Sequence, residues 1–183
     1  MTTVATTVAL LRGINVGRAK RVSMADLREV FTSLGYGDVR TVLQSGNVVF
    51  TASRAPGARA VTAIERALHA STGVQASVLL LAAADVAAIA AANPLRDIST
   101  DPSRAFVTFL SRPVDPSHVP ALDADSLAPE VMVVAERAVY QWCPDGSLAT
   151  KVPPAWWKRL DQVVTTRNLR TVERLVEVGG AAG

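Results

Sequence analysis

The order of strand-like and helix-like segments over residues 1–81 constrains the fold more than any other feature of the sequence. Apolar and β-branched residues run through 4–11, 39–43, 48–51 and 75–81, and such runs predict strands. Between them, 24–34 and 61–68 repeat apolar side chains at helical spacing, which predicts two helices. The order is therefore βαββαβ, which is typical of a ferredoxin-like fold with helices on one face of an antiparallel sheet. We expect strand 4–11 to be central, because it is apolar along most of its length.

Short local signals support these boundaries. Ser23 is a candidate N-cap for the first helix, and Gly35 is a candidate stop. Ser45-Gly46-Asn47 predicts a tight hairpin turn between two strands, because Gly and Asn tolerate left-handed backbone angles. Gly73 is expected to end the second helix.

The remaining residues predict a second α+β subdomain. We expect strands at 105–110, 131–135 and 138–142, and helices at 85–92, 154–160 and 169–178. Four prolines make 111–129 mostly loop, and Asn168 is the candidate N-cap of the last helix. The fold class is thus α+β, with two ferredoxin-like (split βαβ) subdomains. Their expected extents are 1–81 and 82–183, tightly associated and without a clear sequence repeat.

Composition excludes several classes of protein. The chain has 183 residues and a single cysteine, Cys143, so an internal disulfide framework is excluded. No Cys/His cluster has zinc-ligand spacing, and no apolar run approaches the 18 residues or so of a membrane span. The first residues do not resemble a secretion signal, so we expect a cytoplasmic protein with no membrane association.

Positive charge is concentrated at the two ends of the sequence. The formal balance is +5 over residues 1–60, −5 over 61–150 and +3 over 151–183. If the ends fold together, they form a surface that favours phosphates, nucleic acid or anionic metabolites. The alternative is that scattered arginines only solvate the surface.

The most distinctive segment follows the first strand, at residues 11–21. It combines two glycines four positions apart, which let a backbone approach a ligand, with basic residues and the start of a helix. Its spacing is neither that of a Walker A loop nor that of the dinucleotide fingerprint. The candidate ligand-binding residues here are Arg12, Gly13, Asn15, Gly17, Arg18 and Lys20. The alternative is a long loop whose glycines only permit positive φ.

Two further polar motifs are candidates for the same site. Gln44 and Asn47 flank the hairpin turn and could present amides to a ligand, although a turn needs no function. Thr166 and Arg167 stand just before the last helix, where an oxyanion could bind or where the residues only cap the helix. We predict that Arg12 or Asn15 lies within roughly 4–6 Å of Gln44 or Asn47.

No residue is assigned a catalytic role. The sequence contains neither a Gly-x-Ser-x-Gly elbow nor a His-Glu-x-x-His motif. Cys143 has no neighbouring histidine and stands beside Trp142, so packing is the favoured interpretation. Trp156 and Trp157 could stack on a base or anchor a segment on the core. No metal site is expected, and no cofactor, reaction or oligomeric state is assigned.

Several of these segments together resemble the bacterial family known as domain of unknown function sixteen-ninety-seven. In order along the chain, they are Ala9–Gly17, Met24–Arg28, Gln44–Phe50, Asn93-Pro94, Val107–Leu110 and Thr165–Asn168. The resemblance implies two ferredoxin-like subdomains but no biochemical activity. It also implies a Ser-Lys pair after a Pro-x-Gly turn, and here Thr150 stands in place of the serine while Lys151 is retained. A role for a serine nucleophile is therefore not expected, and Lys151 joins the candidate ligand-binding residues.

These observations predict a protein that binds a phosphate-bearing small molecule or nucleotide at the basic, glycine-containing loop. The alternatives are a non-catalytic nucleic-acid-binding module or a partner-binding module. The nucleic-acid alternative ranks second, because Phe50 is the only aromatic residue of the first four predicted strands.

Overall fold

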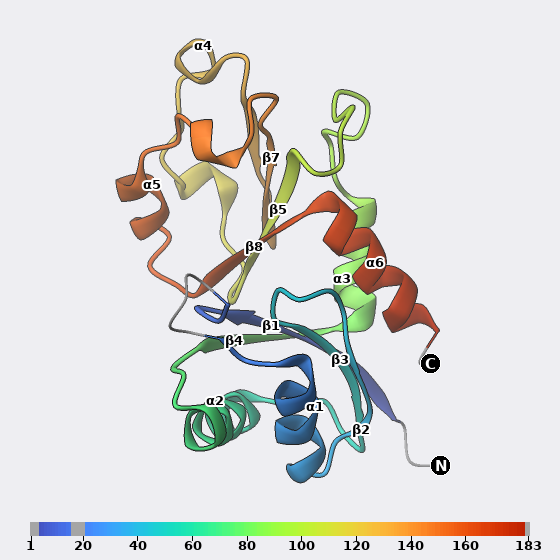
Figure 1. Ribbon diagram of the computed structural model, residues 1–183. Helices are drawn as coiled ribbons and strands as arrows, with labels where there is room; N and C mark the ends of the chain where they lie inside the picture. Colours follow the sequence, from blue (N-terminus) through green and yellow to red (C-terminus); the bar gives the residue numbers. More distant parts are fainter. Residues whose placement is uncertain (1–3, 16–20, 182–183) are drawn as a thin grey trace. The chain divides into compact units, whose positions relative to one another are not determined.

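The computed structural model describes residues 4–15 and 21–181, and it confirms the α+β class (Figure 1). The chain forms two compact units, one made of residues 1–88 and 173–183 and the other of residues 89–172. The sequence predicts one boundary, after residue 81, whereas the boundaries between the two units fall within two helices. The chain leaves the first unit within α3 (Ala83–Ala91) and returns to it within α6 (Leu169–Gly180).

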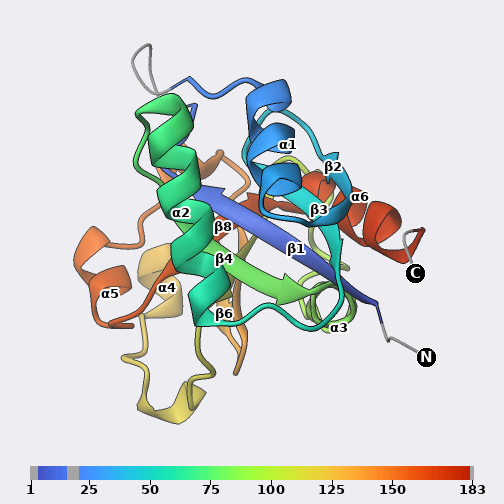
Figure 2. The same cartoon turned by 90° about the horizontal axis from the view of Figure 1, so that it is seen from below.

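The first unit has the predicted βαββαβ order. Its elements are β1 (Ala5–Arg12), α1 (Met24–Ser33), β2 (Gly37–Thr41), β3 (Asn47–Ala52), α2 (Ala58–Thr72) and β4 (Ser77–Ala82). The strands form one antiparallel sheet in the order β2-β3-β1-β4. β1 is therefore central, as its apolar sequence predicted. Helices α1 and α2 cover one face of this sheet (Figures 1 and 2).

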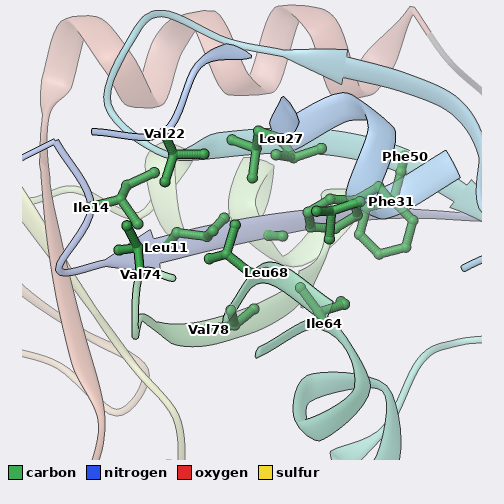
Figure 3. Packing of buried hydrophobic residues seen from close by; sticks show 13 residues of the cluster. Leu11, Ile14, Val22, Leu27, Phe31, Phe50, Ile64, Leu68, Val74 and Val78 are labelled. Carbon is green, nitrogen blue, oxygen red and sulfur yellow. The ribbon is translucent and has the colours of Figure 1, made fainter. Parts of the chain in front are cut away.

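The core of this unit lies between the sheet and the two helices (Figure 3). Phe31 of α1 and Phe50 of β3 are fully buried with ring centroids 5.2 Å apart, and Tyr36 packs on Phe50. Ile64 and Leu68 of α2 are also fully buried. Burying a side chain of this size contributes roughly 1.5–3 kcal/mol, so these residues fix both helices on the sheet.

Local signals set the ends of the helices as expected. The Ser23 hydroxyl accepts the Asp26 amide at 3.0 Å, which caps α1. Gly73 ends α2 in the left-handed region, at φ 70°. The last helix starts where Asn168 Oδ1 accepts the Thr171 amide at 3.0 Å.

The second unit repeats the strand order of the first. Its strands are β5 (Ala105–Leu110), β6 (Val131–Val134), β7 (Ala138–Trp142) and β8 (Val164–Asn168). They form an antiparallel sheet in the order β6-β7-β5-β8. Numbered within each unit, both sheets have the order 2-3-1-4, so the chain contains two ferredoxin-like units whose similarity is absent from the sequence.

The helices of the second unit are short. They are α4 (Ala124–Leu127) and α5 (Pro154–Lys158), with single 3₁₀ turns at Pro116–His118 and Ser147–Ala149. Trp156 is buried and donates its indole N–H to the Pro120 carbonyl at 2.7 Å, while Trp157 is half-buried and packs on Trp156 edge to face. The tryptophan pair therefore anchors α5 on the core, which was one of its two predicted roles.

Strand β8 is a difference from the sequence-based expectation. The sequence predicts only a helix cap or an oxyanion site just before the last helix, whereas residues 164–168 pair along β5 from Val164 opposite Leu110 to Asn168 opposite Phe106. Val164 and the two threonines are β-branched and favour a strand, but the segment lacks the alternation of apolar and polar residues that marks one in a sequence. The hydrogen bonds of β5, more than 50 residues earlier in the sequence, decide the conformation.

Candidate functional site

Two of the predicted motifs meet at one end of the first sheet, where β1 ends. β1 runs antiparallel to β3, with Leu10 opposite Asn47, so the β2–β3 turn lies beside the residues that follow β1. The Leu11 amide donates to the Gly46 carbonyl at 2.8 Å. A Cβ on Gly46 would lie 2.9 Å from Ile14 Cδ1 and 3.1 Å from Leu11 Cβ, and its φ is 73°, so a side chain at this position would be strained.

Asn15 connects the loop after β1 to the turn. Its amide nitrogen donates to the Gln44 carbonyl at 3.1 Å, and its amide oxygen accepts the Val22 N–H at 2.9 Å. The predicted contact between the loop and the turn is therefore present, through the main chain of Gln44. Both polar atoms of the Asn15 side chain are used, which makes Asn15 a positioning residue that closes the base of the loop.

Asn47 supports the turn from inside. It is fully buried, and its amide donates to the Val42 carbonyl at 3.0 Å and to the Ser45 hydroxyl at 2.8 Å. The sequence suggested that this amide could orient a ligand, but the structure places it within the turn. Gln44, in contrast, is exposed.

A polar pocket opens between the turn and the N-terminus of α1. Its volume is about 620 Å³, within the range of small-molecule sites. The described residues that line it are Asn15, Arg21, Val22, Ser23, Met24 and Gln44. The amides of Met24 and Ala25 are the first two of α1, and a helix offers such amides no acceptor of its own. The next two amides, of Asp26 and Leu27, donate to Ser23. We call this the α1 pocket.

Arg12 and Gly13 lie in a different pocket. It has a volume of about 570 Å³ and lies between the end of β1, one face of α2 and the start of β4. Its lining residues are Arg12, Gly13, Thr62, Glu65, Arg66, His69, Gln75, Ala76 and Ser77. We call this the α2 pocket. Of the other residues predicted for the loop, Gly17, Arg18 and Lys20 lie outside the described residues.

Thr166 and Arg167 do not act as one pair, because neighbouring residues of a strand point to opposite faces of the sheet. The Thr166 hydroxyl lies 2.7 Å from the hydroxyl of Thr108. Arg167 donates to the Thr165 hydroxyl at 2.9 Å and to the Thr166 carbonyl at 2.8 Å. Burial lowers the pKa of Arg167 to about 10. Both residues belong to the second unit, and their joining the loop in one site stays a prediction.

Lys151 is exposed, but its main chain belongs to a hydrogen-bonded cluster that sequence analysis missed. The centre of the cluster is Glu130, which is 6% exposed. The Glu130 carboxylate accepts the Thr150 hydroxyl at 2.7 Å, the Lys151 amide at 2.8 Å and the Gln141 side chain at 3.0 Å. The Lys151 ammonium group donates to the Ala128 carbonyl. Thr150 and Lys151 therefore attach their loop to Glu130, and this arrangement explains both residues without a ligand.

Cys143 completes this cluster. Its thiol lies 3.6 Å from Glu130 Oε1, and burial, together with the charge of Glu130, raises its pKa to about 12. A thiol that stays protonated is a poor nucleophile. This agrees with the packing role expected from the sequence. No short sequence signal marks Glu130, because its partners come from 11 to 21 residues further along the chain.

Within the described part of the chain, no group of three or more His, Cys, Asp or Glu could hold a metal ion. Over the same residues, no helix is both long enough and apolar enough to cross a membrane.

Comparison with known proteins identifies a family but no activity. A family described as "Protein of unknown function (DUF1697)" matches residues 4–140. The fold is similar to that of the conserved bacterial protein SP0830 from Streptococcus pneumoniae, with a TM-score of 0.73, 24% identity, and coverage of 97% of this chain and 99% of that one. A putative chlorite dismutase, TA0507, matches over 97% of this chain and 98% of its own at 12% identity, with a TM-score of only 0.24. No curated protein matches the sequence.

Proposed function

The chain belongs to the DUF1697 family, whose description states no activity, and from the site we propose that it binds a phosphate-bearing small molecule in the α1 pocket. The observation that carries the proposal is the pocket itself, with a volume of about 620 Å³ and a largely polar lining at a helix N-terminus. A small metabolite or nucleotide fits a pocket of this size.

The chemistry of the lining favours an oxyanion. Arg21 and Gln44 are exposed at the pocket and supply side-chain donors. The first amides of α1 add further donors, together with the positive end of the helix dipole. Asn15 holds the turn and the loop at a fixed separation through its bonds to Gln44 and Val22. In this proposal Arg21 pairs with phosphate oxygens, and Gln44 orients the ligand. Arg18 and Lys20 of the same loop remain candidates.

The nucleic-acid alternative has lost its one aromatic candidate in the first sheet. Phe50 is fully buried between the sheet and the helices, so its ring cannot stack on a base. We retain the small-molecule proposal, together with the expected cytoplasmic location.

A binding experiment with matched variants tests the proposal. Thermal shift and calorimetry with inorganic phosphate, pyrophosphate and ADP measure affinity for the chain and for Arg21→Gln. A probe at 100 times its dissociation constant should add about 2.7 kcal/mol of stability. Loss of one charge-assisted contact, worth about 1.5–3 kcal/mol, should weaken binding roughly 10-fold or more.

The control is Arg40→Gln, which removes the same charge from an exposed position in β2 that lines neither described pocket. It should bind like the unmodified chain. The proposal fails if none of the three probes binds, or if Arg40→Gln weakens binding as much as Arg21→Gln does.

A further inference from the structure

The α2 pocket gathers basic side chains from two elements. Arg12 ends β1, while Arg66 and His69 come from α2. Glu65, Arg66 and His69 stand three, four and seven residues after Thr62, so these side chains share one face of α2, which forms one wall. The opposite wall is the start of β4, which pairs with the end of β1 where Ser77 lies opposite Arg12.

Glu65, the carboxylate among the described lining residues, already has a structural role. Glu65 Oε1 accepts the Val78 amide at 2.9 Å, which ties α2 to β4. Among the described residues, the charged and titratable groups that line the pocket are Arg12 from β1 and Glu65, Arg66 and His69 from α2. With His69 neutral the formal charge of these four groups is +1, and with His69 protonated it is +2. The pocket therefore becomes more attractive to an anion as the imidazole gains a proton.

Gly13 lines the pocket beside these groups and is half-buried. Its φ is 92°, a conformation that residues with a side chain rarely adopt. The pocket volume of about 570 Å³ holds a small anion together with part of a larger molecule.

From this arrangement we propose that the α2 pocket is a second oxyanion site, distinct from the α1 pocket, in which Arg12, Arg66 and protonated His69 bind a sulfate- or phosphate-type group. Binding at this site is linked to proton uptake by His69. Since linkage is reciprocal, the bound anion holds the proton on His69 to higher pH, and lower pH tightens binding.

The chain allows a local test because it has only two histidines. Sulfate is the probe, because its charge stays fixed between pH 5 and 8. NMR follows the titration of the His69 and His118 imidazoles in sodium sulfate and in sodium chloride of equal ionic strength. His118 is the internal reference, because it lies in the second unit beside Asp115, at 3.3 Å.

We expect sulfate to move the midpoint of the His69 titration upward by about 0.5 pH unit or more, which corresponds to roughly three-fold tighter binding to the protonated form. The His118 midpoint should stay where chloride leaves it. In Arg66→Gln and in Arg12→Gln the sulfate-dependent movement should fall to less than half.

Two controls separate this site from its surroundings. Arg59→Gln removes a charge from the first turn of the same helix, outside the α2 pocket, and should leave the movement intact. Arg21→Gln, in the α1 pocket, should also leave it intact, so failure of one proposal does not imply failure of the other. The inference is overturned if sulfate leaves the His69 midpoint unchanged, moves both histidines equally, or still moves His69 fully in the Arg12→Gln/Arg66→Gln double variant.

Discussion

At the scale of single residues, a few polar side chains hold the loops and turns of this protein in place. Asn47 and Glu130, which are buried, and Asn15, which is half-buried, each bond to two or more main-chain or side-chain groups. A buried donor that loses its acceptor costs about 1–3 kcal/mol, so each of these residues fixes the conformation around it.

Glu130 gives the clearest prediction of this kind. Glu130→Ala removes the acceptor of Thr150, Lys151 and Gln141 at once, and we expect a loss of about 3 kcal/mol in the free energy of unfolding. Denaturant titration followed by tryptophan fluorescence measures it, because all three tryptophans belong to the second unit.

The control for this experiment is Glu136→Ala, in the exposed turn between β6 and β7. It should change stability by no more than about 0.5 kcal/mol. Equal effects of the two variants would show that the Glu130 cluster does not stabilise the loop.

Cys143 makes stability depend on pH at the alkaline end. Its pKa is raised from 9.0 to about 12 in the fold, so the native protein keeps the thiol proton where the unfolded chain loses it. The stabilisation from this group is complete below about pH 9 and is lost as the pH rises from about 9 towards 12. Unfolding free energies at pH 8 and pH 10.5 should therefore differ more for the unmodified chain than for Cys143→Ala.

Arg167 has a lowered pKa, so its contribution to the free energy of unfolding rises with pH above about 10, opposite to that of Cys143. Both proteins contain Arg167, so its contribution cancels in the comparison. If the two proteins show the same dependence on pH, Cys143 ionises as freely in the fold as in the unfolded chain.

At the scale of elements, the ends of helices and strands decide where chemistry is possible. The α1 pocket exists because the N-terminus of α1, the end of β1 and the β2–β3 turn meet at one end of the first sheet. Strand β8 instead keeps two candidate residues apart. Side chains alternate between the faces of a sheet, so Thr166 and Arg167 point to opposite faces of the second sheet.

Helix α6 offers a matched pair of glycines near its end. A Cβ on Gly179 would lie 3.1 Å from the Cβ of Ala83, whereas a Cβ on Gly180 would meet nothing within 4 Å. Gly179→Leu should therefore destabilise the first unit by about 1–3 kcal/mol through overpacking. Gly180→Leu should be neutral or slightly stabilising, because leucine has the higher helix propensity.

Thermal unfolding of the two variants, together with hydrogen exchange of the β1 amides, measures this difference. Equal stability of the two proteins would mean that the end of α6 does not pack against α3.

At the scale of the whole molecule, the chain is a structural repeat without a sequence repeat. Both sheets have the strand order 2-3-1-4, yet α1 and α2 contain 10 and 15 residues whereas α4 and α5 contain four and five. Sheet topology depends on which segments are apolar and how they are connected, and many sequences meet that requirement.

The sequence by itself determined the elements of the first unit and their boundaries to within a few residues. Periodicity, the Ser23 cap and the Gly73 stop are local signals, and local signals are sufficient to define helices and hairpins. The sequence also predicted that the loop after β1 would meet the Gln44 turn, and the antiparallel pairing of β1 with β3 brings these ends together.

Only the tertiary structure decided how the polar residues are used. It separated Arg12 from Asn15 into two pockets, buried the amide of Asn47 and gathered distant donors around Glu130. It also made a strand of residues 164–168 and returned the end of the chain to the first unit. The physical reason is common to all of these cases. The burial and hydrogen-bond partners of a polar group depend on residues far away in sequence, and no local pattern encodes them.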